Sequence, residues 1–209
     1  MALTDELTAT EPVLDALVLA AFRYNPRRIV TAEGFEHTFA LYVLNRFLLA
    51  RGLRPALERA TNPVVVNLCG TGGIPAGRIH WDDLQLRRRY GGLRATMQGA
   101  RANDLLGVAF TGRHPDSLVR YVLYNPLFVD TALADPFTQP TRALVKALSR
   151  LFAAPVTRAL PPILELLTTP PAEPLSAYRG GRRVRVSGPA FDPETAARLG
   201  RLLDGLTAG

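Results

Sequence analysis

Cysteine and histidine are scarce in this chain of 209 residues. Cys69 is the only cysteine, which excludes an internal disulfide and any zinc site that is built from several cysteines. The three histidines, His37, His80 and His114, lie far apart and lack the spacing of a metal-binding motif. We therefore expect no metal site and a reducing, cytoplasmic location.

Lysine is nearly absent, although the chain is basic. Lys146 is the only lysine among 25 Lys and Arg residues, and 18 Asp and Glu residues leave a net charge of +7. A protein that reads nucleic acid gathers its basic residues on one face. Here they are scattered along the sequence, apart from short runs at 87–89 and 182–183. We expect no nucleic-acid partner.

Long apolar runs are missing as well. No run reaches the roughly 18 residues that a membrane-spanning helix requires, and residues 1–6 are acidic where a signal peptide would be basic. With 47% hydrophobic and 21% charged residues, the composition is that of one globular domain. We expect a single domain over 1–209 that is neither exported nor bound to a membrane.

Short segments rich in apolar and β-branched residues predict four strands. They cover 13–21, 63–69, 118–124 and 183–186. The pattern between and after them predicts helices, which cover 31–52, 92–112, 142–152, 163–167 and 193–206. This alternation favours an α/β domain with a mostly parallel sheet, whose functional crevice lies beyond the carboxyl ends of the strands.

Four stretches occur in the order of a known family. Residues 31–36 with 47–49 match a T-x-[DE]-G-F-E…F-L-L helix, and 65–68 match the strand that precedes a catalytic serine. Residues 77–84 match G-x-I-x-[FW]-x-D-L, and 102–103 match the A-N that closes a catalytic helix. The chain thus resembles the short-chain dehydrogenase/reductase family, in particular its retinol dehydrogenase-like branch. The resemblance implies a partial Rossmann-like fold, a doubly wound parallel sheet that is truncated at its amino-terminal side.

The same resemblance implies where the family's catalytic residues fall, and these positions are changed. The helix asparagine falls on Tyr42 and the serine on Gly70, while the tyrosine and lysine of Y-x-x-x-K fall on Thr96 and Ala100. In the family that tyrosine supplies a proton and the lysine lowers its pKa. The proton donor and its ammonium neighbour are therefore absent from their usual places.

The family's nucleotide-binding glycines are also missing. No G-x-x-x-G-x-G stands before the first predicted strand, and only about a dozen residues precede it where a βαβ unit takes roughly 30. The family's N-N-A-G ends on Phe22, and its P-G is Pro126-Leu127. The Gly-rich turn 70–73 follows the wrong strand for a dinucleotide. We therefore expect no cofactor and no conventional NAD(P)-dependent dehydrogenase activity.

The family's strand order has a consequence for segment 13–21. It corresponds to the family's fourth strand, which lies in mid-sheet beside the first, so without the earlier strands it becomes an edge. An apolar edge exposes unpaired N–H and C=O groups and invites strand pairing. We expect it to be covered in a homo-oligomer or hetero-oligomer, by a rearranged amino-terminal segment, or by residues upstream of a misassigned start.

Six residues would surround the family's substrate pocket in this fold, and they supply a ring, a phenol, a thiol, hydroxyls and an amide: Phe22, Tyr42, Cys69, Thr71, Thr96 and Asn125. Such groups bind a carbonyl or orient a proton transfer, or they only line the pocket. Our first hypothesis is a redox-inactive protein that binds an apolar small molecule and promotes a cofactor-independent cyclisation or isomerisation in specialised metabolism. The alternatives are a non-catalytic partner or scaffold subunit of a homologous enzyme, and an NAD(P)-dependent oxidoreductase with a misassigned start.

Overall fold

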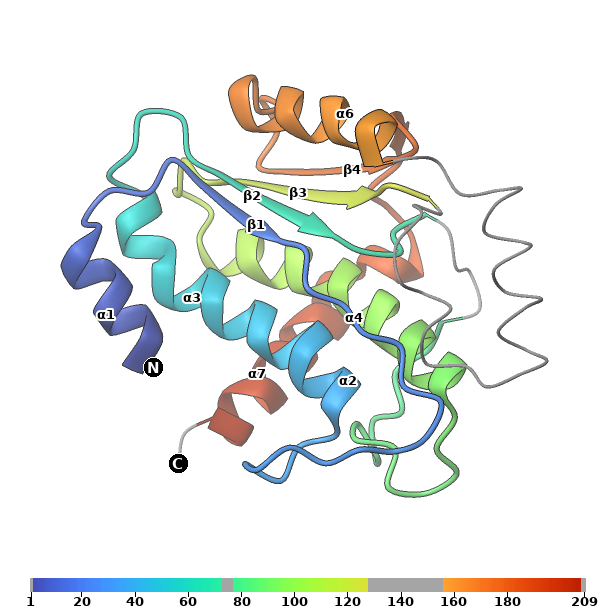
Figure 1. Ribbon diagram of the computed structural model, residues 1–209. Coiled ribbons are helices and arrows are strands. Elements are labelled where there is room, and N and C mark those ends of the chain that lie inside the picture. Colours follow the sequence, from blue (N-terminus) through green and yellow to red (C-terminus); the bar gives the residue numbers. More distant parts are fainter. Residues whose placement is uncertain (1, 73–76, 128–155, 208–209) are drawn as a thin grey trace.

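A five-stranded sheet forms the centre of the protein in a computed structural model that describes residues 2–72, 77–127 and 156–207 (Figure 1). The strands lie in sequence order: β1 (Ala16–Leu19), β2 (Val64–Leu68), β3 (Arg120–Asn125), β4 (Leu175–Arg179) and β5 (Arg182–Val184). β1 to β4 are parallel, and β5 is antiparallel to β4. The expected fold class, a mostly parallel Rossmann-like sheet with flanking helices, is confirmed.

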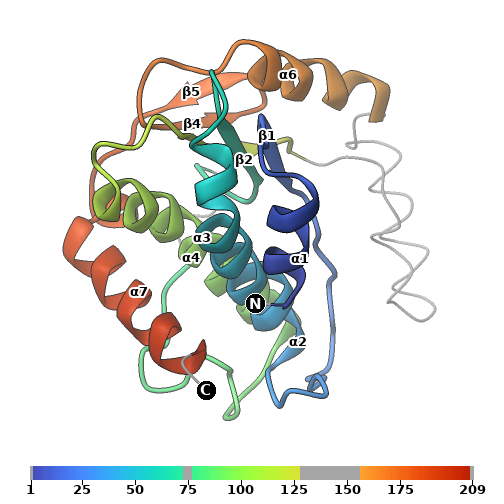
Figure 2. The same cartoon turned by 90° about the vertical axis from the view of Figure 1, so that its left-hand side faces the viewer.

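Helices cover both faces of the sheet. α3 (Asn45–Leu57) and α4 (Gly92–Arg113) lie on one face, and α6 (Val156–Thr168) lies on the other (Figure 1). α1 (Ala2–Thr10) packs beside α3, and α7 (Pro193–Thr207) packs beside α4 (Figure 2). Val64, Val65 and Val66 of β2 are fully buried between the two layers. This two-sided burial explains why the strand is a continuous apolar run.

The helix predicted from Thr31 starts later than expected, and its cap is a different residue. It begins with α2 (His37–Phe39), widens into a π-helical turn, η1 (Ala40–Leu44), and continues as α3. The Glu36 carboxylate accepts hydrogen bonds from the N–H groups of Thr38 (2.9 Å) and Phe39 (2.7 Å), which makes Glu36 the N-cap. Thr31 lies instead in the turn before it, where Gly34 has a φ of +85°.

The predicted end of this helix near Gly52 is also wrong, because the helix runs on to Leu57. Gly52 marks a close contact between helices. A Cβ at this position would lie 2.7 Å from Cγ2 of Thr4 in α1, so the two helices approach too closely for a side chain. Neither α1 nor strand β4 is anticipated by the apolar pattern of the sequence. The other predicted elements in the described residues occur with shifted bounds, and the predicted helix 142–152 lies outside those residues.

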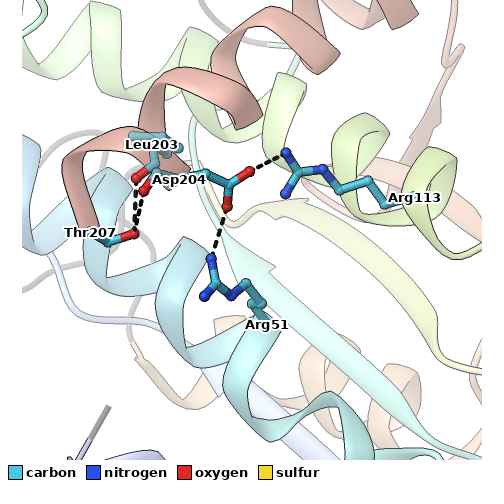
Figure 3. A network of polar contacts seen from close by, with 5 residues as sticks. All are labelled: Arg51, Arg113, Leu203, Asp204 and Thr207. Atoms are coloured by element: carbon cyan, nitrogen blue, oxygen red, sulfur yellow. Dashed lines mark hydrogen bonds and ion pairs between the residues drawn. The ribbon is translucent and has the colours of Figure 1, made fainter. Parts of the chain in front are cut away.

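One carboxylate links α7 to the two helices beneath the sheet. Asp204 of α7 accepts hydrogen bonds from Arg51 of α3 (2.8 Å) and Arg113 of α4 (2.5 Å), as Figure 3 shows. Thr207 donates to the carbonyl groups of Leu203 and Asp204 one turn earlier in the same helix. The ion pairs are partly exposed, so each contributes at most about 1 kcal/mol. Their main effect is to orient α7 on the α3–α4 pair.

Of the helices in the described ranges, none is long and apolar enough to cross a membrane.

Candidate functional site

Three segments meet just beyond the carboxyl ends of β1 and β2. Phe22 follows β1, Tyr42 lies on η1, and Gly70 follows β2. The rings of Phe22 and Tyr42 pack edge to face, with their centroids 4.9 Å apart. The Gly70 N–H donates to the Tyr42 hydroxyl oxygen at 3.1 Å. This corner is the edge at which parallel α/β sheets bind their ligands.

The π-helical turn explains how Tyr42 reaches this corner. Turns of this kind are rare and occur often at functional sites. The Tyr42 ring lies against Gly99 of α4, where a Cβ would approach the ring to 2.4 Å. The carbonyl of Tyr42 accepts a hydrogen bond from Asn103 Nδ2 at 2.8 Å. Helix α4 thus provides both the space for the ring and a partner for the widened turn.

A buried cation lies one helical turn after Tyr42. The guanidinium of Arg46 is 2% exposed and stacks over the Tyr42 ring, with its Cζ 4.5 Å from the ring centroid. It donates to Asn67 Oδ1 and to the carbonyl groups of Leu68 (2.7 Å) and Ala21 (2.9 Å). Burial lowers the pKa of Arg46. All of these acceptors are neutral. Because they lie at the carboxyl ends of β1 and β2, the Arg46 hydrogen bonds link the two strand ends.

Asn67 connects this cation to α4 and β3. Its Nδ2 donates to Asn103 Oδ1 (2.9 Å) and to the Tyr121 hydroxyl (3.0 Å). Asn67, Asn103 and Tyr121 are all at most 1% exposed. Buried polar groups that satisfy one another in this way hold neighbouring elements in a single arrangement. The network therefore fixes the position of Arg46 and of the turn that carries Tyr42.

Cys69, Thr71 and Asp104 form the floor of the corner. Burial, together with the nearby Asp104, raises the pKa of the Cys69 thiol to about 12, so the thiol stays neutral and is not an activated nucleophile. Burial also raises the pKa of Asp104 to about 6, against the opposing effects of Thr71 and Arg101. Thr71 is fully buried, and its backbone carbonyl accepts from Asn125 Nδ2 at 3.0 Å.

The structure brings five of the six predicted pocket residues to one corner, namely Phe22, Tyr42, Cys69, Thr71 and Asn125. Thr96 lies on α4, one turn before Gly99, and its hydroxyl donates back to the Gly92 carbonyl at 2.9 Å. Ala100 is buried in the core. The sequence analysis missed Arg46, Asn67 and Asp104. Arg46 was detectable, because it lies four residues after Tyr42 and so on the same helix face.

Known proteins with similar sequences are named as dehydrogenases and reductases. No family model matches the chain. A Streptomyces protein described as "Putative daunorubicin C-13 ketoreductase DnrU" is 33% identical over 185 residues, which cover 82% of this chain and 58% of that protein. Human dehydrogenase/reductase SDR family member 12 is 28% identical over 106 residues, which cover 50% of this chain and 32% of that protein. The chain thus spans about a third to three fifths of these relatives.

Solved structures agree on the fold. The NADPH-bound carbonyl reductase from chicken fatty liver superimposes with a TM-score of 0.59 at 14% identity, over 88% of this chain and 71% of that one. The chain is related to the short-chain dehydrogenase/reductase family. This relationship confirms the resemblance on which the site residues were placed.

The relationship corrects our first functional hypothesis. A redox-inactive, cofactor-independent cyclase or isomerase is contradicted, because the sequence relatives are named as a ketoreductase and a dehydrogenase/reductase. The comparisons favour the oxidoreductase alternative instead. Residues 70, 96 and 100 are the positions at which this chain departs from the family motif that the resemblance implies. A lost motif does not by itself point to another reaction.

The described residues do not fit the nicotinamide dinucleotide that the family implies. Phe22 and Leu127 are 39% and 51% exposed at the positions where the resemblance places glycines, so side chains occupy space that a dinucleotide would need. Ala100 offers no ammonium group to a ribose. Beyond β1 the sheet has no further strand in the described residues. We therefore derive no reaction step through the dinucleotide.

Leu127 has a backbone conformation that favours glycine, at a position where the resemblance implies a glycine. Its φ is +63°, in the left-handed region that favours glycine. Its N–H donates to Asn125 Oδ1 at 2.9 Å, and its side chain lies against Gly180, where a Cβ would be 2.7 Å from Leu127 Cδ1. The turn after β3 thus retains a strained non-glycine residue at the rim of the site.

We expect the Leu127→Gly variant to be about 1 kcal/mol more stable than Leu127→Ala, since alanine keeps the left-handed strain and glycine does not. Both variants lose the same contact with Gly180, so the difference between their free energies of unfolding reports the backbone strain at residue 127. Urea unfolding followed by circular dichroism measures it. Equal stabilities would mean that residue 127 does not adopt a positive φ in solution.

Proposed function

We propose that this chain binds an apolar ketone at the Tyr42–Gly70 corner, as the substrate-binding part of a carbonyl-reducing oxidoreductase. The observation that carries the proposal is a polar corner with a phenol, at the carboxyl ends of the strands, in a relative of the short-chain dehydrogenases/reductases. The printed name of the Streptomyces relative supports a ketone as the substrate class. The exposed side chains of Phe22 and Leu127 supply an apolar rim.

The proposal assigns the hydride-donating dinucleotide to protein outside the described residues. Among the described residues no strand pairs with the outer edge of β1, and Val18 on this strand is 42% exposed. We propose that a strand from a second copy, a partner subunit or another segment pairs with this edge. A cytoplasmic location belongs to the same proposal, and fractionation of native cells checks it.

The test uses the tagged chain purified from its native host with whatever protein accompanies it. We expect oxidation of NADPH in the presence of daunorubicin or a simpler aromatic ketone. The loss of the reduced-nicotinamide absorbance should match the alcohol that mass spectrometry detects. A preparation that forms no alcohol from any ketone of an aromatic panel would contradict the proposal.

A pair of variants tests the role of the β1 edge. Val18→Lys places a charge on the edge strand, so we expect it to abolish NADPH oxidation and leave ketone binding intact. Leu160→Lys is the matched control, because Leu160 of α6 is similarly exposed (46%) but lies off the sheet edge. Equal activity of the two variants would argue against a strand at β1.

A further inference from the structure

A hydroxyl group lies next to Gly70, the residue at which the family resemblance implies a serine. Gly70 has no side chain, and its N–H holds the Tyr42 hydroxyl oxygen at 3.1 Å. That oxygen therefore lies within one hydrogen-bond length of the backbone on which the family carries its serine. Gly70 is only half-buried, so the corner is open at this point although the Tyr42 side chain is 5% exposed.

The Tyr42 hydroxyl has an unused donor. Its oxygen accepts from Gly70, but no acceptor in the described residues receives its own proton. A buried O–H without an acceptor destabilises the folded protein, because the group has lost its hydrogen bond to water and gained none in return. Most buried polar groups in proteins have a partner, so one without an acceptor needs an explanation. A ligand with an acceptor oxygen at the mouth of the corner would supply the missing partner.

The neighbouring charge makes this hydroxyl a suitable donor. Burial raises the pKa of Tyr42, and so does Cys69, so the phenol carries its proton at neutral pH. The Arg46 guanidinium over the ring acts in the opposite direction and lowers the pKa. A cation on the ring face withdraws electron density from the oxygen, which strengthens the hydrogen bond that the O–H gives.

Two other donors around the corner are already engaged in hydrogen bonds. The Thr96 hydroxyl donates to the Gly92 carbonyl (2.9 Å), and Asn125 Nδ2 donates to the Thr71 carbonyl (3.0 Å). The Cys69 thiol is a weak donor and is buried. The Thr71 hydroxyl is also unpaired in the described residues, but Thr71 is fully buried, whereas Tyr42 lies beside the half-buried Gly70. Of the predicted pocket residues, Tyr42 therefore has the hydroxyl best placed to meet an entering oxygen.

We propose that Tyr42 donates the hydrogen bond that holds and polarises the carbonyl oxygen of the substrate, in place of the serine that the family resemblance implies at position 70. The inference rests on the proposed function, since it assumes a ketone in this corner. It assigns Tyr42 a binding and polarising role in which its proton stays on the phenol oxygen. Arg46 is then a positioning residue, which acts through the Tyr42 ring.

The experiment measures the infrared carbonyl band of acetophenone, labelled with carbon-13 at the carbonyl, bound to the purified chain. We expect the band of the bound ketone to lie at lower frequency than in an apolar solvent. Tyr42→Phe should abolish this shift and weaken binding about 3- to 10-fold, the equivalent of one neutral hydrogen bond. A shift that persists in Tyr42→Phe overturns the inference, as does a shift that disappears in Thr96→Val instead.

Tyr124→Phe is the matched control, because Tyr124 is a buried phenol (3% exposed) in the core cluster on the α6 side of the sheet. It should keep both the shift and the affinity. If Tyr42→Phe fails to fold, fluorotyrosine at position 42 keeps the ring and makes the hydroxyl a stronger donor, so a larger shift is expected and an unchanged band overturns the inference. If acetophenone and daunorubicin both fail to bind the wild-type chain, the proposed function is wrong, and the inference about Tyr42 is wrong with it.

Discussion

Asn67→Leu should lower the free energy of unfolding by about 3–5 kcal/mol. Leucine removes the side-chain acceptor of the buried Arg46 guanidinium. It also leaves Asn103 Oδ1 and the Tyr121 hydroxyl without the hydrogen bonds they receive from Asn67 Nδ2. The side chains of Arg46 and Asn67 are both at most 2% exposed, so water does not replace the lost partners. Loss of a partner costs most when it leaves a buried charge less well solvated.

Urea unfolding followed by far-UV circular dichroism measures this loss. The matched control is Asn62→Leu, which makes the same change at an exposed position in the loop before β2. Its expected effect is within about 0.5 kcal/mol of zero. A loss below about 1 kcal/mol in Asn67→Leu would show that the network does not hold the ends of β1 and β2 together.

Asp104→Asn should stabilise the protein at neutral pH and leave it unchanged in acid. Burial raises the pKa of Asp104 from 3.8 to about 6, so the folded chain binds this proton more tightly than the unfolded chain does. The resulting stabilisation is fully present below about pH 4 and is lost as the pH rises through 6. The pKa difference corresponds to at most about 3 kcal/mol, at about 1.4 kcal/mol per pH unit.

Stability curves between pH 4 and pH 8 test the sign and the size of this effect. We expect Asp104→Asn to exceed the wild type by about 1–3 kcal/mol at pH 8, and the two curves to converge near pH 4. Asp15→Asn removes the same charge from an exposed position and should follow the wild type. Parallel curves for Asp104→Asn and the wild type would show that the buried carboxyl is not the titrating group.

The candidate site was only partly predictable. Motif positions located Tyr42 and Gly70, because the flanking stretches preserve their register with the family. They did not reveal that the tyrosine hydroxyl reaches the backbone of Gly70, since this contact depends on the π-helical turn and on the small Gly99 across from it. Arg46 and Asp104 were missed because charged residues are rarely buried, and a sequence does not show which ones are.

The sequence alone also misjudged the reaction class. The family's tyrosine and lysine are replaced at 96 and 100, and this loss led us to the hypothesis of a non-redox reaction. The sequence relatives correct this inference, because they are named as a ketoreductase and a dehydrogenase/reductase. The absence of known groups leaves open what replaces them, and here the structure offers a phenol on the neighbouring helix.

The sequence by itself determined the fold class and the core strands, because apolar β-branched runs such as 64–66 are stable only when both faces are covered. Tertiary structure decided what local pattern does not encode. β4 is a strand because it pairs with β3 and β5. The first long helix begins at His37 because the Glu36 carboxylate caps it and the Glu36 N–H donates to Gln85 Oε1 in a distant loop. It also decided which polar residues are buried, since their burial depends on partners that are far apart in the chain.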